Sequence, residues 1–217
     1  MFLNKPIGAI LVSVMVLMTG CSTQPPITAR PATVTTVDQE MTPREPTRLQ
    51  PEDQAQREYE QALASVDAGH VKTARQQLTE LTRSYPTLSG PYANLGILSL
   101  REGNMEAAEN YLTTAVQINP KNAMAFNQLG ILYRQTGRFD EARQAYTTAL
   151  EIDPDYANAH LNLGILFDLF LQDTVQALQH YERYLELVHD DDEKVSLWLA
   201  DLKQRIANNS VSTNEIK

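Results

Sequence analysis

The side chains of this 217-residue sequence that could do chemistry are few and widely separated. Its four histidines, at positions 70, 160, 180 and 189, do not form a metal-ligand set, and its glycines occur singly rather than in a phosphate-binding loop. The acidic run 190–193 could hold calcium, but no EF-hand spacing follows it, and acidic residues also favour the start of a helix. No nucleophile constellation is present. We therefore predict no enzyme, no cofactor and no metal site.

One residue has a distinctive covalent chemistry, the single cysteine Cys21. A lone thiol excludes an internal disulfide and a cysteine-based metal cluster. Lys5 and an apolar run of 12 residues, 7–18, precede it. This run is too short for a membrane-spanning helix, which needs about 20 residues. Residues 1–20 therefore have the organisation of a targeting segment.

The residues before this cysteine, Leu17-Met18-Thr19-Gly20, resemble the lipobox of bacterial lipoproteins. The resemblance implies that residues 1–20 are a signal peptide and that Cys21 is the site of lipid attachment. Ser22, rather than an aspartate, follows the cysteine. By the same resemblance, this implies a lipoprotein of the outer membrane of a Gram-negative bacterium that faces the periplasm. The alternative is a leader followed by an incidental cysteine.

The segment 21–52 is expected to be a disordered tether. Residues 22–52 contain six prolines and seven threonines and have no apolar periodicity. Such a composition cannot bury enough apolar surface to fold. A glycosylated segment or a proline-motif ligand is the alternative interpretation.

A seven-residue pattern recurs at 92–98, 126–132 and 160–166, and each copy begins 34 residues after the last. All three copies contain Leu-Gly-Ile-Leu, and a fixed period of this length indicates stacked structural repeats. The unit 123–156 has further characteristic residues: Phe126, Leu129, Gly130, Tyr133, Ala142, Tyr146, Ala149 and Pro154. This pattern resembles the tetratricopeptide repeat (TPR). The resemblance implies an all-α fold, a right-handed αα-superhelix of about four helix-turn-helix repeats.

The predicted solenoid covers 53–190, with units at about 55–88, 89–122, 123–156 and 157–190. The first unit is degenerate, because Gln61 and Ala62 replace Leu-Gly. The fourth has one inserted residue in the turn Leu171-Gln172-Asp173, with Asp173 capping the next helix. The expected helices are 53–68, 71–84, 89–102, 105–118, 123–136, 139–152, 157–171, 174–188 and 191–207.

The last predicted helix, 191–207, carries an apolar stripe at helical spacing, formed by Val195, Trp198, Leu199, Leu202 and Ile206. We interpret it as a cap that closes the open end of the solenoid. A helix that binds a partner is the alternative. Residues 208–217 are polar and are expected to form a disordered tail.

The TPR resemblance implies that a protein or peptide ligand binds in a concave groove lined by the first helix of each repeat. In that family, positions 2, 5, 9, 12 and 13 of a unit face the groove. On this sequence the partner-binding candidates are Ala93, Ile97, Leu100, Arg101, Met124, Asn127, Ile131, Arg134, Gln135, Leu161, Ile165 and Asp168. The other residues at these five positions of the three units are Gly90, Asn158 and Leu169. Ile97, Ile131 and Ile165 form an apolar ladder, which suits an amphipathic or extended segment. Alternatively, these isoleucines only complete the core between repeats.

The formal net charge of −9 argues against nucleic acid or an anionic bilayer as the main partner. Contact with the membrane would occur only through the N-terminal lipid. Leader, cysteine and repeats together resemble the pilotin-type TPR lipoproteins that assemble type IV pilus secretins. The expected function is an envelope adaptor or assembly factor, with pilus or secretin assembly as the role that this resemblance implies. The alternatives are an accessory of a TonB/ExbB-type energy-transducing complex and a scaffold for peptidoglycan hydrolases.

Overall fold

The computed structural model describes residues 50–189 and 192–214, which form helices joined by short turns. The predicted leader, the lipid-attachment residue and nearly all of the tether lie outside the described residues. The helices are α1 (Pro51–Asp67), α2 (Val71–Ser84), α3 (Ser89–Arg101), α4 (Met105–Ile118), α5 (Ala123–Gln135), α6 (Phe139–Ile152), α7 (Ala157–Leu166), α8 (Thr174–Leu187) and α9 (Glu193–Asn214), with a π-helical turn, η1 (Phe167–Leu171), after α7. The described residues thus confirm the nine helices and the all-α class.

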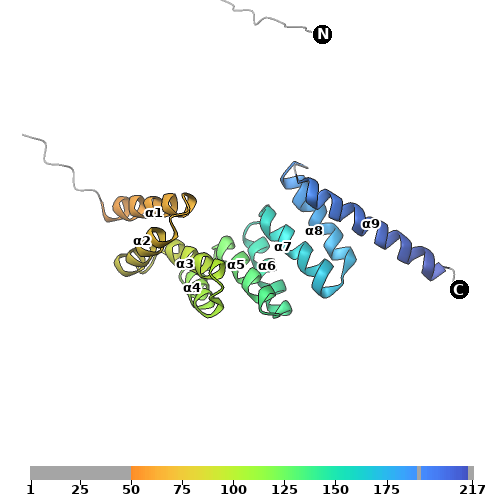
Figure 1. Ribbon diagram of the computed structural model, residues 1–217, viewed down its shortest axis with the longest axis horizontal. Helices are drawn as coiled ribbons and strands as arrows, with labels where there is room; N and C mark the ends of the chain where they lie inside the picture. The colour runs from red at the N-terminus through yellow and green to blue at the C-terminus, as the bar shows by residue number, and fades with distance from the viewer. Residues whose placement is uncertain (1–49, 190–191, 215–217) are drawn as a thin grey trace, which may run out of the picture. The chain divides into compact units, whose positions relative to one another are not determined.

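Consecutive helices pair as hairpins α1/α2, α3/α4, α5/α6 and α7/α8, and each hairpin packs on the next (Figure 1). The first helices of successive repeats also touch directly, because α5 contacts both α3 and α7. We call α1, α3, α5 and α7 the A helices, and the face that they share the A face. This arrangement confirms the predicted superhelix of TPR hairpins.

The recurring Leu-Gly pair is explained by close approach between the two helices of a hairpin. A Cβ atom on Gly96 would lie 2.6 Å from Cγ of Leu112, and one on Gly164 would lie 2.7 Å from Cδ1 of Tyr181. Both distances are far inside van der Waals contact, so only glycine fits. These glycines therefore let the two helices of a hairpin pack closely.

The fourth repeat differs from the other three at the end of its A helix. In those repeats Gly69, Gly103 and Gly137 follow the first helix with positive φ. Gln172 adopts this left-handed conformation in the fourth repeat, with φ 57°. The inserted residue is absorbed in η1, so the regular helix predicted for 157–171 instead ends at Leu166. Asp173 caps α8 as expected, accepting a hydrogen bond from the Gln176 amide at 3.0 Å.

Replacing Gln172 by glycine should stabilise the protein by about 1 kcal/mol, because glycine adopts positive φ without steric strain. Replacing it by valine should destabilise the protein, since a branched Cβ is least tolerated there. Chemical denaturation of both variants tests this prediction. A glycine variant no more stable than the valine variant would contradict it.

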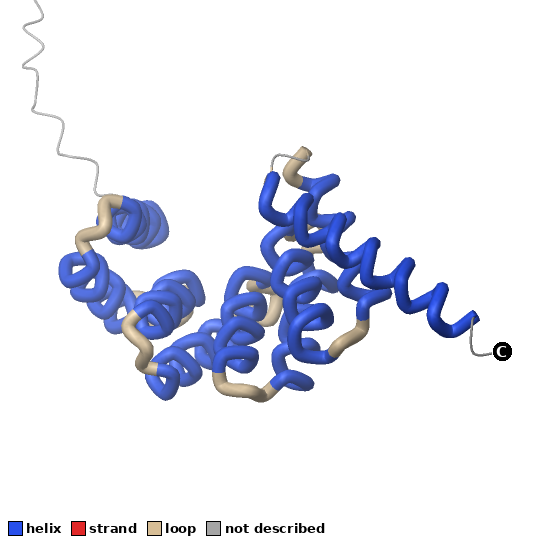
Figure 2. The backbone as a smooth tube through the Cα atoms, turned by 45° about the vertical axis from the view of Figure 1, so that its right-hand side comes forward, coloured by secondary structure: helices blue, strands red, loops and turns tan. Residues whose placement is uncertain are grey.

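Helix α9 packs against α8 and continues to Asn214, rather than ending at 207 as predicted. Its C-terminal turns extend beyond the α7/α8 hairpin (Figure 2). Val195 and Leu202 are buried against Ala177, Tyr181 and Leu185. Asp192 begins the helix, because its carboxylate accepts a hydrogen bond from the Val195 amide. Asp190 and Asp191 lie outside the described residues.

No helix in the described ranges has both the length and the hydropathy of a membrane span.

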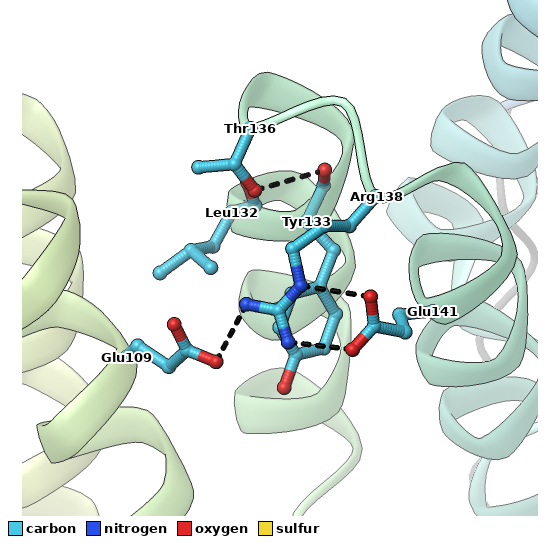
Figure 3. Close-up of polar contacts among 6 residues, drawn as sticks. All are labelled: Glu109, Leu132, Tyr133, Thr136, Arg138 and Glu141. Atoms are coloured by element: carbon cyan, nitrogen blue, oxygen red, sulfur yellow. Dashed lines mark hydrogen bonds and ion pairs between the residues drawn. The ribbon is translucent and has the colours of Figure 1, made fainter.

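An arginine joins the second and third repeats (Figure 3). Arg138 contacts Glu109 of α4 at 2.7 Å and Glu141 of α6 at 2.5 Å. Its guanidinium also lies 4.2 Å from the ring centroid of Tyr133. Hydrogen bonds with Glu141 and Glu109 raise the pKa of Arg138 and keep it charged. Because all these groups are partly exposed, the contacts orient neighbouring hairpins more than they add stability.

Candidate protein-binding groove

The predicted groove residues divide into a buried group and a group that reaches solvent. Ala93 is fully buried, and Asn127 is 2% exposed. Ala93 is packed with Ala115 and Ala125, where small side chains let three helices meet. The amide oxygen of Asn127 accepts a hydrogen bond from Asn162 at 3.0 Å, which links α5 to α7. These two residues hold repeats together and are not available to a ligand, which corrects their assignment to the groove surface.

The isoleucine ladder is half-buried at each of its three positions. Ile131 packs against a core cluster that contains Leu163 and Leu166, and Ile165 packs against the cluster that contains Tyr181. Among the other candidates, Leu100, Met124, Arg134 and Leu161 are half-buried. Both interpretations of the ladder therefore have a physical basis, because each side chain has one buried side and one side that reaches solvent.

The exposed candidates lie at the C-terminal ends of the A helices. Arg101 and Gln135 are exposed there, and Leu169 at the same repeat position is 65% exposed. Its neighbour Phe170 is 39% exposed. The Phe170 ring packs against Phe139 in a tilted arrangement with centroids 4.8 Å apart, and the Arg134 guanidinium lies 5.9 Å from the Phe170 ring centroid. The A face therefore combines apolar and cationic groups at one end of its helices.

A hollow of about 380 Å³ lies between α7, η1 and α9, and we call it the C-terminal hollow. Its lining comes from Ile165, Asp168, Leu169, Tyr181, Trp198, Asp201 and Arg205. Ile165 and Asp168 are predicted groove residues, and Leu169 holds a groove position in the repeat pattern. The last three come from α9, so the cap helix forms one wall. Sequence reasoning assigned their helix a capping role and did not place them beside the groove.

Asp168 is not a free ligand for a partner, because its side chain is only 7% exposed and pairs with Arg205 at 2.7 Å. It also accepts a hydrogen bond from the Tyr181 hydroxyl at 3.4 Å. Burial raises the pKa of Tyr181 above its usual range, and the Asp168 carboxylate raises it further. A buried carboxylate requires such partners, since an unpaired one would cost several kcal/mol. Asp168 thus ties η1 to α9, which corrects its assignment as a contact residue.

A larger hollow, about 780 Å³, lies at the other end of the A face, between α1, the α2–α3 turn and the start of α3. Tyr59 lines it, and its hydroxyl accepts a hydrogen bond from the Asn94 side chain at 2.8 Å. Gly90, read at a groove position, also lines it. Sequence reasoning missed Tyr59 because the first repeat is degenerate. Counting back 34 residues from Ala93 would have found it.

Two histidines meet within the fourth repeat, between α7 and α8, with 3.0 Å between Nδ1 of His160 and Nδ1 of His180. The His180 ring stacks on Phe167, and Nε2 of His160 lies 3.0 Å from the Pro154 carbonyl oxygen. Burial, with a smaller contribution from His160, lowers the pKa of His180 to about 4. His160 occupies the repeat position that Tyr92 and Phe126 hold in the two preceding units, and its ring packs against His180 with centroids 5.3 Å apart. No cluster of three or more His, Cys, Asp or Glu side chains suited to a metal occurs among the described residues.

The depressed pKa of His180 predicts a loss of stability in acid. The unfolded chain binds a proton near pH 6.5, whereas folded His180 resists protonation until about pH 4. Stability from this group is therefore complete above about pH 6.5 and falls as the pH drops toward 4. Between about pH 7 and pH 5, the melting temperature of the parent should fall more than that of a His180→Gln variant. Equal falls would contradict the prediction.

Family models match three overlapping segments of the chain. The TPR repeat model matches 130–168, and tetratricopeptide repeat models match 111–144 and 90–122. Residues 90–168 carry tetratricopeptide repeats. TPR arrays typically act as scaffolds that bind protein or peptide ligands, and the described residues have that architecture. Curated proteins provide no match to the sequence.

Solved TPR structures share the fold at low sequence identity. PilF of Pseudomonas aeruginosa is 21% identical with a TM-score of 0.65, and the match covers 72% of this chain and 71% of PilF. TTC0263, a thermophilic TPR protein of Thermus thermophilus, is 24% identical with a TM-score of 0.58, covering 69% and 81%. YrrB, described as a TPR protein with an unusual peptide-binding site, is 21% identical with a TM-score of 0.54, covering 70% and 76%. These similarities establish the fold.

Proposed function

We propose that this protein is a lipid-anchored TPR adaptor of the bacterial envelope that assists the assembly of a larger protein machine, a type IV pilus or its secretin. The A face carries the protein-binding part of the proposal. It presents half-buried isoleucines along three repeats, exposed side chains at the helix ends and a hollow at either end. A surface that presents apolar and charged groups along successive repeats suits an amphipathic segment.

The anchoring part of the proposal rests on the sequence before and at Cys21. The short apolar run and Leu17-Met18-Thr19-Gly20 resemble a lipobox, and Ser22 favours the outer membrane. Several acyl chains would hold the protein stably, since one chain gives only marginal membrane binding. The Pro- and Thr-rich segment would then carry the repeats into the periplasm.

A Cys21→Ser substitution should leave a folded protein that no longer sediments with membranes. The substituted oxygen cannot form the thioether, whereas residue 21 precedes the predicted repeats in the sequence. Fractionation of cells with and without detergent checks the result, with a Ser22→Ala variant as the matched control. Membrane association of the Cys21→Ser protein equal to that of the parent would contradict the lipid anchor.

The pilus assignment is supported by the pilotin-like combination of lipobox, tether and repeats, and the fold likeness to PilF agrees with it. Deleting the gene should reduce the amount of assembled secretin in the outer membrane, and the parental gene should restore it. Undiminished secretin assembly in the deletion strain would reject the pilus assignment and leave the anchored adaptor to be tested by its partners.

A further inference from the structure

The fourth repeat exposes an apolar residue where the two preceding repeats expose polar ones. Positions 101, 135 and 169 are equivalent by the 34-residue period and hold Arg101, Gln135 and Leu169. Leu169 is 65% exposed. It belongs to the π-helical turn η1, which replaces the regular helix end of the other repeats. Such turns are frequent at functional sites. The fourth repeat thus places a leucine at a position that is exposed in all three repeats.

Leu169 borders the C-terminal hollow together with Ile165 and Trp198. The Trp198 ring packs against Tyr181, with centroids 6.1 Å apart, which holds this wall in place. At about 380 Å³, the hollow lies at the small end of the range of roughly 300–1,000 Å³ that ligand pockets occupy. This volume suits one large side chain of a partner rather than a whole folded element.

The ionisable side chains that line the hollow carry a net charge of −1, and Lys194 lies beside it with Nζ 4.8 Å from the Trp198 ring centroid. Asp168 and Asp201 both bond to Arg205, at 2.7 and 2.9 Å, so two carboxylates share one guanidinium. The Asp201 side chain remains 66% exposed. Residues 151–217 contain thirteen acidic and five basic residues, so this third of the chain carries a net charge of −8 of the total −9. A cationic ligand would therefore be attracted to the hollow, and an anionic one repelled.

We propose that the C-terminal hollow docks a cationic amphipathic segment of a partner protein. One large apolar side chain of the segment lies against Leu169 and Trp198, and a lysine or arginine lies beside Asp201. This proposal rests on the proposed protein-binding function and names the chemistry of the ligand at one end of the A face. A second copy of this chain fits less well, because the whole chain carries a formal net charge of −9 and would be repelled by the acidic C-terminal third.

Trp198 is the only tryptophan of the chain, so its fluorescence reports directly on the hollow. The probes are two synthetic helical peptides of about 15 residues without tryptophan, with leucines on one face and either lysines or glutamates on the other. Each is titrated into the full chain in detergent solution. The lysine peptide should shift the Trp198 emission to the blue and bind at least about tenfold more tightly than the glutamate peptide, with a preference that weakens in salt.

A matched pair of variants locates the binding. Leu169→Lys should lose at least about tenfold in affinity for the lysine peptide, because it removes the apolar contact and adds a repelling charge. Leu197→Lys, on α9 and 64% exposed in the parent, should bind as the parent does. Equal binding of the two peptides, or an unchanged affinity in Leu169→Lys, would overturn the proposal. A parent that forms a dimer and becomes monomeric in Leu169→Lys would also overturn it, in favour of a second copy.

Failure of this proposal can be told apart from failure of the adaptor function. Photocrosslinking from Gln135, outside the hollow, tests whether the A face meets a partner in cells. If Gln135 crosslinks to a partner while the lysine peptide does not bind, the cationic-segment proposal is overturned and the adaptor function stands. If neither occurs, both are overturned.

Discussion

Replacing Gly130 by valine should lower the free energy of unfolding by about 3 kcal/mol, the upper end of the usual cost of overpacking. A Cβ atom at Gly130 would overlap the Tyr146 ring, which is fully buried and has no space to move into. Its hydroxyl lies 3.4 Å from Nε of Arg134, so displacing the ring also disturbs a groove residue. Relief requires α5 and α6 to separate, which would loosen the hairpin at the centre of the array.

The control for this substitution is Gly137→Ala in the same repeat. Gly137 has a φ of +76°, and a Cβ atom there would meet nothing within 4 Å. Its cost is therefore only that of the backbone conformation, about 1 kcal/mol. Denaturant titration followed by far-ultraviolet circular dichroism compares the two. A Gly130→Val protein as stable as Gly137→Ala would contradict the close helix–helix contact.

Replacing Leu202 by aspartate should cost several kcal/mol at the interface between α8 and α9, since it places an unpaired charge in an apolar core. Leu202 is fully buried with Val195, Tyr181 and Leu185. Because stacked repeats contact mainly their neighbours, the damage should concentrate in the last hairpin and release α9. The emission of Trp198 should move to the red as it enters water.

Leu197→Asp is the matched control, on the same helix and with a side chain that is 64% exposed in the parent. Its stability should change by less than about 0.5 kcal/mol, as is usual for surface positions, and its emission should match that of the parent. Equal effects of the two substitutions would show that α9 is not docked as the structure describes.

The sequence predicted the helices well where the 34-residue period applies. A glycine recurs at positions 96, 130 and 164 because the two helices of each hairpin approach too closely there for a Cβ atom. The period of these glycines therefore locates the hairpins. The capping role of Asp173 could also be predicted, because a cap is a local interaction.

The parts that sequence reasoning did not predict depend on non-periodic or long-range contacts. Tyr181 follows Tyr146 by 35 residues, one more than the repeat period, which indicates an insertion but not that η1 absorbs it as a π-helical turn. Asp168 has a groove position in the repeat, yet Arg205 reaches it from 37 residues away and buries it in an ion pair. The hollow beside them exists only because α9 supplies a wall, and no feature of the repeat pattern encodes that contact.

The most direct measurement of the central claim, that the A face is the protein-binding surface, is site-specific photocrosslinking in cells. A photoreactive residue is placed singly at Gln135 or Leu169 on the A face, and at Val175 or Leu197 elsewhere, since all four positions are exposed. The account predicts that Gln135 and Leu169 crosslink to the same partner protein, while Val175 and Leu197 do not. Crosslinks to that partner from Val175 or Leu197, with none from Gln135 and Leu169, would contradict it.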